Sequence, residues 1–477
     1  MFFIGLSLLL LIVGLFVGSG LTVVILLAAS QLALLLRFVK ENTVTGLGAF
    51  TFMYFQFFAI RPIYILWEKD YKLFSSPFRL YVNPEMISSG MWWGAVALFA
   101  FVVGGFLGRR LASALFNRKR MHTDRAMPAI SVQTVKRKIP VLLVVQFLTV
   151  GLGVLFRGAA KYGAAAGAYA YDLPIVFQGI HLFCALVIID CYLQRKTLGA
   201  LIPLIISVFL LLCSTYMIRE FALFRGSWVT GLMIFGVGFL MHWKKRVPYI
   251  WLILPIVLLF PLFGFLGSKR TVAADQLDEV IIEQSDKIFS PLSYWTFYNS
   301  RGDMNIFDTF VAAKESSPKV QNHVWVWLYT FVHWVPRKLW PGKPAKGILQ
   351  DLSFMHKAPY NPGISGLYLL DGGYAWMLFS MGLLGAIVGA ADFYALFRLT
   401  GYIRVCLYAG LVVNALFLAR FCMWQYFYQL LYFFLPCILL AKFLNTDKRR
   451  YSPAVSARRP AMRSRDTEEE SSTTKMH

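Results

Sequence analysis

Twelve apolar stretches, separated by short segments that carry charged residues, dominate this chain. An α-helix rises about 1.5 Å per residue, so roughly 20 apolar residues span the hydrocarbon core of a bilayer. Helices also satisfy every backbone polar group inside lipid. The stretches therefore predict an all-α polytopic membrane protein with about 12 transmembrane helices. Their approximate ranges are 2–17, 21–36, 44–66, 90–108, 139–156, 173–193, 198–217, 227–243, 248–267, 367–391, 402–419 and 422–441.

The amino-acid composition agrees with a membrane protein. Of the 477 residues, 58% are hydrophobic, against about 45–50% in soluble proteins. We interpret residues 2–36 as a helical hairpin that turns at 18–20, and not as a cleaved signal peptide. The apolar part is roughly twice as long as a signal h-region, and it has neither a basic start nor a small-residue cleavage site.

The formal net charge of +23 lies mostly in the short links between apolar stretches. Lys and Arg gather in the cytoplasmic links of membrane proteins, and the link after the fourth stretch holds nine of them from Arg109 to Lys138. Alternation from there places the basic residues at 195–196 and 244–246, and the tail from Lys442, on the same side. We therefore expect a multi-pass protein of the bacterial inner membrane with both termini cytoplasmic. We expect no nucleic-acid partner.

This topology divides the chain into four regions. Residues 1–267 hold transmembrane helices 1–9, residues 268–366 form one large periplasmic loop, and residues 367–441 hold transmembrane helices 10–12. The cytoplasmic tail at 442–477 is basic, then acidic, and poor in apolar residues. Such a composition predicts disorder.

Several cations fall at or beyond the outer surface, against the usual charge bias. One interpretation is that they snorkel to headgroups or form salt bridges. The other is anion recognition, because a guanidinium matches phosphate oxygens and stays charged. We favour a shared anionic ligand for Arg157, Arg219 and Arg225, which all lie beside span ends. The full set is Arg61, Arg79, Arg157, Lys161, Arg219, Arg225, Lys269, Arg270, Arg301, Arg337, Lys338 and Arg420.

The loop contains short helical patterns of its own. Residues 275–289 and 303–315 predict amphipathic helices, the second with Asp303 as a plausible cap. Its apolar face consists of Ile306, Phe307, Phe310 and Val311. Residues 323–335 are apolar and rich in tryptophan, but too few to span a bilayer, so they predict an interfacial or re-entrant helix. The tryptophans, among them Trp340, either anchor this helix at the headgroups or stack on sugar rings.

The segment 335–344, Val-Pro-Arg-Lys-Leu-Trp-Pro-Gly-Lys-Pro, is the most distinctive string in the chain. Its three prolines fix an extended path and prevent helix continuation. Arg337, Lys338 and Lys343 are then free to meet an anion. Further along, Asp371 precedes Gly372-Gly373 at the outer end of the tenth span, where glycine permits close approach of a ligand or helix.

The loop string resembles one found in a known family. Pro-Arg-Lys-Leu-Trp-Pro-Gly-Lys-Pro, followed by a Gly-rich span from Gly372-Gly373 to Gly382-Leu383-Leu384-Gly385, is similar to Wzy-type polymerases of O-antigen and related oligosaccharide repeat units. These enzymes are GT-C-like and related to O-antigen ligases. Arg225-Gly226, entering the eighth span, and Arg301 followed by Asp303 also fit the family pattern. The resemblance covers roughly residues 215–390.

The resemblance implies a periplasmic-face glycosyltransferase that needs no metal, nucleotide sugar or other cofactor. It would polymerise undecaprenyl-pyrophosphate-linked repeat units into O-antigen or a related surface polysaccharide. A lipid-linked glycan would serve as donor and another as acceptor, within the lipid bilayer, alongside a chain-length co-polymerase and a flippase. Two alternatives stay open: an O-antigen ligase, and a lipid-linked oligosaccharide flippase or other transporter.

The site residues follow from the charge of the pyrophosphate leaving group, which calls for cations aimed at the departing oxygen. The catalytic candidates are Arg225, Arg337, Asp303, His333 and His356. The candidates for binding pyrophosphate or glycan are Arg157, Arg219, Arg270, Arg301, Lys338, Lys343, Trp340 and Asp371. A histidine can accept the acceptor's proton near neutral pH. The choice of general base among His323, His333, His356, Asp303, Glu220 and Asp371 stays open. We predict no metal ligands.

Overall fold

The fold is helical throughout the described residues of the computed structural model, apart from one short β pairing between Lys72–Leu73 (β1) and Leu80–Tyr81 (β2). The described residues are 2–17, 20–41, 43–69, 71–73, 80–116, 132–162, 173–221, 226–244, 247–251, 306–316, 325–332, 340, 363–399, 401–419 and 423–445. The helices are α1 (Phe2–Phe16), α2 (Leu21–Val39), α3 (Gly46–Phe55), the π-helical turn η1 (Gln56–Ile60), α4 (Arg61–Glu68), α5 (Pro84–Phe116), α6 (Val132–Tyr162), α8 (Leu173–Arg195), α9 (Leu198–Phe221), α10 (Gly226–Lys244), α14 (Ile306–Ser316), α15 (Trp325–Val332), α17 (Gly363–Phe397), α18 (Gly401–Leu418) and α19 (Met423–Asn445).

Within the described part of the chain, five helical segments are long and apolar enough to cross a membrane: α2, the continuous run α3–η1–α4, α5, α17 and α18. Large apolar side chains are also exposed along α1, α6 and α9, for example Leu15, Phe147 and Phe209. Soluble proteins rarely expose so much contiguous apolar surface, whereas lipid-facing helices do. The chain is therefore consistent with a helical membrane protein. The predicted ninth span, 248–267, and the predicted loop helix at 275–289 lie almost wholly outside the described residues.

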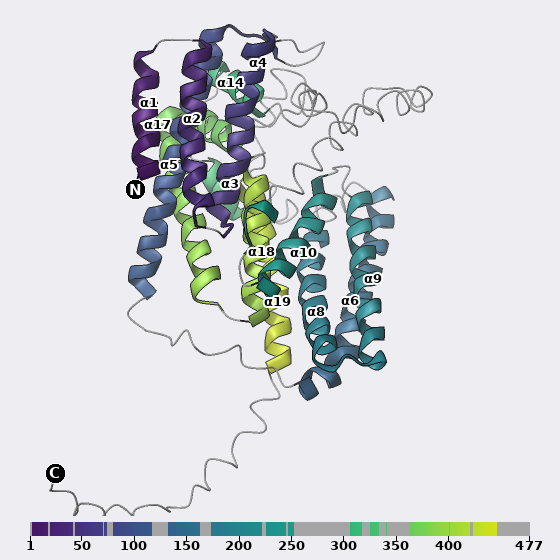
Figure 1. Cartoon of the computed structure of the whole chain (residues 1–477). Helices are drawn as coiled ribbons and strands as arrows, with labels where there is room; N and C mark the ends of the chain where they lie inside the picture. The colour runs from purple at the N-terminus through teal and green to yellow at the C-terminus, as the bar shows by residue number, and fades with distance from the viewer. Residues whose placement is uncertain are drawn as a thin grey trace, which may run out of the picture.

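The helices form two groups joined by α18 and α19 (Figure 1). The first group contains α1–α5, α14 and α17, with α1 and α2 packed as the predicted hairpin. The second contains α6, α8, α9 and α10. Helix α18 packs against α3 and α17 on one side and against α10 and α8 on the other, while α19 packs against α8. The C-terminal helices therefore connect the two groups.

Helices α5 and α17 share the most extensive contact between helices in the first group, and their backbones approach closely at glycines. A Cβ added at Gly385 would lie 2.7 Å from the carbonyl carbon of Phe101, and one at Gly389 would lie 2.8 Å from that of Gly105. Small residues allow such approach between helices in membranes. Helix α5 extends past the predicted span 90–108 through Glu85 and through Arg109 and Arg110, because charged residues outside an apolar window can still continue a helix. Helix α17 extends past 367–391 at both ends but is interrupted at Gly372 and Gly373, whose dihedral angles are not helical.

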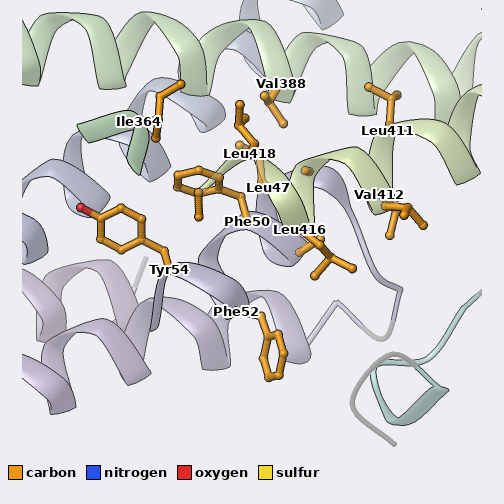
Figure 2. Packing of buried hydrophobic residues seen from close by; sticks show 14 of the residues in the cluster. Leu47, Phe50, Phe52, Tyr54, Ile364, Val388, Leu411, Val412, Leu416 and Leu418 are labelled. Atoms are coloured by element: carbon orange, nitrogen blue, oxygen red, sulfur yellow. The ribbon is translucent and has the colours of Figure 1, made fainter. Parts of the chain in front are cut away.

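The core of the first group lies where α3, α17 and α18 meet. Figure 2 shows Leu47 and Phe50 of α3 near Ile364 and Val388 of α17 and Leu418 of α18. All five side chains are fully buried. This packing fixes α17, the helix on which the loop helices α14 and α15 rest.

One end of the molecule gathers the basic links, and we call it the basic end. There the Asp392 carboxylate accepts hydrogen bonds from the backbone N–H groups of Gly46 (2.7 Å) and Leu47 (3.1 Å), which begin α3. It also pairs with Arg109 (3.2 Å), which in turn pairs with Glu41 (3.2 Å). The carboxylate thus closes the N-terminus of α3, where unpaired N–H groups and the helix dipole favour negative charge.

Polar contacts also join helix ends of the second group at the basic end. Asp190 near the end of α8 accepts from Tyr402 at the start of α18 (2.5 Å) and contacts His242 near the end of α10 (2.7 Å). Lys138 near the start of α6 donates to the Phe443 carbonyl near the end of α19 (2.6 Å). These contacts join helix ends that the sequence assigned to one side. We call the opposite end, which carries α14, α15 and the start of α17, the loop end.

Candidate functional site

The loop end contains a helix from the loop that is built into the bundle. Helix α14 packs against α17, α5 and η1, and every residue of 306–313 is buried. The prediction of a helix within 303–315, with Ile306, Phe307, Phe310 and Val311 on its packed face, is confirmed. The opposite face is buried too, so this helix does not lie on a surface as an amphipathic helix would. Aromatic contacts help to seat it, since Phe58 of η1 meets Phe307 and Phe310 edge-on at 5.9 and 5.2 Å.

A bidentate ion pair explains why the second face of α14 can be buried. Arg61 Nε donates to Asp308 Oδ1 (3.1 Å) and Arg61 Nη2 donates to Asp308 Oδ2 (2.7 Å). Arg61 is 4% exposed and Asp308 is 0% exposed. A fork of this kind satisfies both carboxylate oxygens and offsets the cost of desolvating the two charges.

The ion pair changes the interpretation of Arg61. The sequence placed this residue among outward cations, for which anion binding and salt bridging were both open. The structure favours the salt bridge, because the guanidinium pairs with the Asp308 carboxylate. The π-helical turn η1 directly precedes Arg61 and shifts the helical register there; such turns occur often at functional sites.

The second loop helix, α15, rests on α17 at a break in that helix. Asp371 is fully buried and is followed by Gly372 (φ −160°) and Gly373 (φ 79°), whose dihedral angles are not helical. The positive φ at Gly373 suits glycine. The Asp371 carboxylate accepts from the Val326 N–H at the start of α15 (3.4 Å to each oxygen) and from Trp376 Nε1 (2.9 Å).

A second contact fixes α15 along α17. Trp327 Nε1 donates to Ser380 Oγ (2.9 Å), and its ring stacks on Tyr368 at a centroid distance of 5.9 Å. The predicted helix within 323–335 is therefore confirmed as α15. Its outer face exposes Leu328 and Phe331, as expected of a helix that meets lipid at an interface.

Further aromatic residues gather at the loop end beside the Asp371 break. Trp93 of α5 stacks on Tyr374 of α17 at a centroid distance of 3.9 Å, and Trp92 packs edge-on against Trp93. Trp93 and Tyr374 are partly exposed. Among the predicted tryptophans of the loop, Trp340 is 40% exposed. Exposed aromatic rings suit headgroups or sugar faces, so both readings of the tryptophans stay open.

Two of the predicted cations can be placed by their helices. Position 157 lies near the C-terminal end of α6 and position 219 near that of α9. These helices pack side by side (Figure 1), and each begins at the basic end, so both positions lie toward the loop end. Helix α10 begins at Gly226 at that same end, one residue after Arg225. The backbone thus places positions 157 and 219 toward the end of the second group at which α10 begins.

The remaining predicted site residues lie outside the described part of the chain. Asp371 and Trp340 are the predicted residues whose side chains the structure describes. Those outside are Arg225, Arg270, Arg301, Asp303, His333, Arg337, Lys338, Lys343 and His356.

The sequence did not predict a buried polar cluster between α6 and α8. His181 is fully buried, with Nδ1 3.3 Å from Gln146 Nε2 and Nε2 3.1 Å from Thr149 Oγ1. Gln146 and Thr149 are three residues apart and therefore share a helix face. This spacing of polar residues inside an apolar stretch was the available signal. The contacts satisfy both ring nitrogens without an acidic partner, which suits a neutral imidazole.

Searches with the chain against protein-family models, curated proteins and solved structures find no match.

Proposed function

We propose that this chain polymerises undecaprenyl-pyrophosphate-linked oligosaccharide repeat units on the outer face of the bacterial inner membrane. In this proposal the basic end is cytoplasmic, as Lys and Arg bias requires, and about 12 helices cross the bilayer. The loop end then faces the periplasm. The tail and both termini are cytoplasmic.

One observation carries the proposal: helices of the long loop are anchored inside the bundle at the end opposite the basic end. Arg61 and Asp308 hold α14 there, and Asp371 holds α15. A transporter has no evident need for such an anchored loop, whereas a transferase needs residues fixed around two bound substrates. The loop string at 335–344 and its family resemblance supply the reaction class.

The proposed reaction is a direct glycosyl transfer. A hydroxyl oxygen of the acceptor sugar bonds to the anomeric carbon of the donor glycan while the bond from that carbon to the pyrophosphate oxygen breaks. Undecaprenyl pyrophosphate leaves with the bonding electron pair, and the hydroxyl proton passes to a base or to water. Arg157, Arg219, Arg225 and Arg337 are proposed to stabilise the charge on the leaving oxygen.

Reconstitution with purified lipid-linked repeat unit tests the proposal, with the products separated on a gel. The parent chain should give a ladder of polymer lengths, and Arg225→Ala or Arg337→Ala should abolish it while leaving membrane insertion intact. Arg110→Ala is the matched control, since Arg110 is an exposed arginine of the basic end, and this variant should keep the ladder.

The outcomes separate the site from the reaction. Normal ladders from both arginine variants would show that these residues are not the site. A parent chain that inserts but extends no repeat unit would refute the polymerase proposal. In cells, loss of the chain should leave single repeat units on the surface glycan; polymer retained on the carrier would instead identify a ligase.

A further inference from the structure

We propose that the Arg61–Asp308 ion pair is a positioning device that holds loop helix α14 in a socket of the bundle and so sets the geometry of the transferase site. The inference rests on the proposed function. It assigns these two residues a role in the reaction without contact to substrate.

The socket is shaped for α14. Gly90 of α5 leaves room for Val311, because a Cβ at position 90 would lie 2.8 Å from Val311 Cγ2. Gly363 leaves room for Ile306 in the same way, at 2.8 Å. Phe58 closes a third side against Phe307 and Phe310. These apolar contacts define the shape of the socket into which α14 fits.

Apolar contact is not sufficient to keep α14 there, because the helix carries a carboxylate into the socket. Asp308 is 0% exposed, and a buried charge without its partner is strongly unfavourable. The Arg61 fork removes this penalty only when α14 is fully seated, since both hydrogen bonds require one geometry. The pair thus favours the seated position over partly withdrawn ones.

The position of α14 matters because of what flanks it in the sequence. The proposed site residues Arg301 and Asp303 precede Ile306 by five and three residues, and eight residues separate Ser316 from Trp325 of α15. Both loop helices pack against α17. A shift of α14 would displace the residues attached to it, and a displacement of about 1 Å can cost 10²-fold in rate.

The test compares single neutral variants with the double variant. Arg61→Gln removes the guanidinium partner of the buried Asp308 carboxylate, and Asp308→Asn removes the carboxylate that faces the buried Arg61, whereas Arg61→Gln/Asp308→Asn leaves two neutral groups that can still hydrogen-bond. We expect each single variant to lower kcat about 100-fold, with KM for the lipid-linked repeat unit changed less than about twofold. The double variant should have a kcat about tenfold higher than either single variant. Glu41→Gln, which weakens a part-exposed pair at the basic end, should keep parental kcat.

A crosslink reports the seating of α14 without using activity. Cysteines at Gly90→Cys and Val311→Cys lie close enough for a disulfide if α14 is seated. Oxidation should crosslink them readily in the otherwise parental chain, about tenfold more slowly with Asp308→Asn, and at an intermediate rate in the double neutral variant. The crosslink is read by gel mobility after cleavage at a protease site inserted between residues 117 and 131, which lie between the two cysteines in the sequence, so that a disulfide keeps the two fragments together.

Two results would overturn the positioning role. One is Asp308→Asn with parental crosslinking and parental kcat. The other is a double variant as impaired as both singles in kcat and crosslinking, which would mean that the charges do not act as a pair. A third result would separate the two proposals: the crosslinking rate changes with Arg61 and Asp308 as expected, but neither the parent chain nor any variant polymerises repeat units. In that case the two residues do seat α14, and the proposed function is wrong.

Discussion

The close packing of α5 on α17 makes Gly385→Ala a sharp test of the fold. The new Cβ would lie 2.7 Å from the Phe101 carbonyl carbon, where an unstrained contact between carbon atoms is about 3.5–4.0 Å. The obstacle is backbone, so no side chain can rotate away, and the helices must separate by roughly 1 Å. Overpacking costs about 1–3 kcal/mol, and we expect about 3 kcal/mol because neighbouring glycine contacts would open as well.

Gly382→Ala is the matched control, one turn earlier on α17. Its Cβ would meet only the Ala100 carbonyl oxygen, at 3.7 Å, and alanine favours helix over glycine by about 1 kcal/mol. Both variants gain this propensity, so it cancels, and the two should differ by about 3 kcal/mol in the free energy of unfolding because of the overpacking at Gly385. Unfolding by SDS in mixed micelles, followed by circular dichroism, measures this difference. Equal midpoints for Gly385→Ala and Gly382→Ala would refute the proposed helix contact.

Two further changes test buried polar groups. Asp392→Asn should destabilise the fold by about 3 kcal/mol, because the Gly46 and Leu47 N–H groups lose a charged acceptor and Arg109 loses the more buried of its two carboxylate partners. Glu41→Gln, which removes a carboxylate that is 24% exposed, should cost less than about 1 kcal/mol. A comparable loss from both would contradict the role of Asp392. Ser207→Ala removes a buried hydroxyl that has no hydrogen-bond partner among the described residues, so it should be neutral or stabilise by up to about 1 kcal/mol. A clear loss of stability in the same SDS assay would show that this hydroxyl is bonded.

Local patterns in the sequence predicted most of the helical segments. Apolar length located α2, α5 and α18, and the apolar spacing in 303–315 located α14, because both patterns are set by nearby residues. The helix ends were less accurate. Helix α17 spans Gly363–Phe397 with a break at Gly372 and Gly373, whereas the sequence predicted one span at 367–391, since hydropathy detects the part of a chain that suits lipid and not where helical hydrogen bonds are interrupted or end.

Pairings between distant residues could not be read from the sequence. The sequence left both anion binding and salt bridging open for Arg61, because its partner Asp308 lies 247 residues away in the chain. Asp371 was singled out from its glycine neighbours, but its bond to the Val326 N–H depends on how α15 docks. The π-helical turn η1 has no residue signature that we recognise. These features arise from tertiary contacts, which local propensity does not encode.

The socket around α14 has a consequence for biogenesis. The ribosome makes α14 after α5 and η1 but before α17, so part of its seat does not yet exist when the helix is synthesised. Arg61 is already present by then, but Gly363 and the residues of α17 that pack against α14 are not. Seating of α14 is thus a late step in assembly. In a ribosome-stalled chain that ends before residue 363, α14 should therefore be cleaved by added protease.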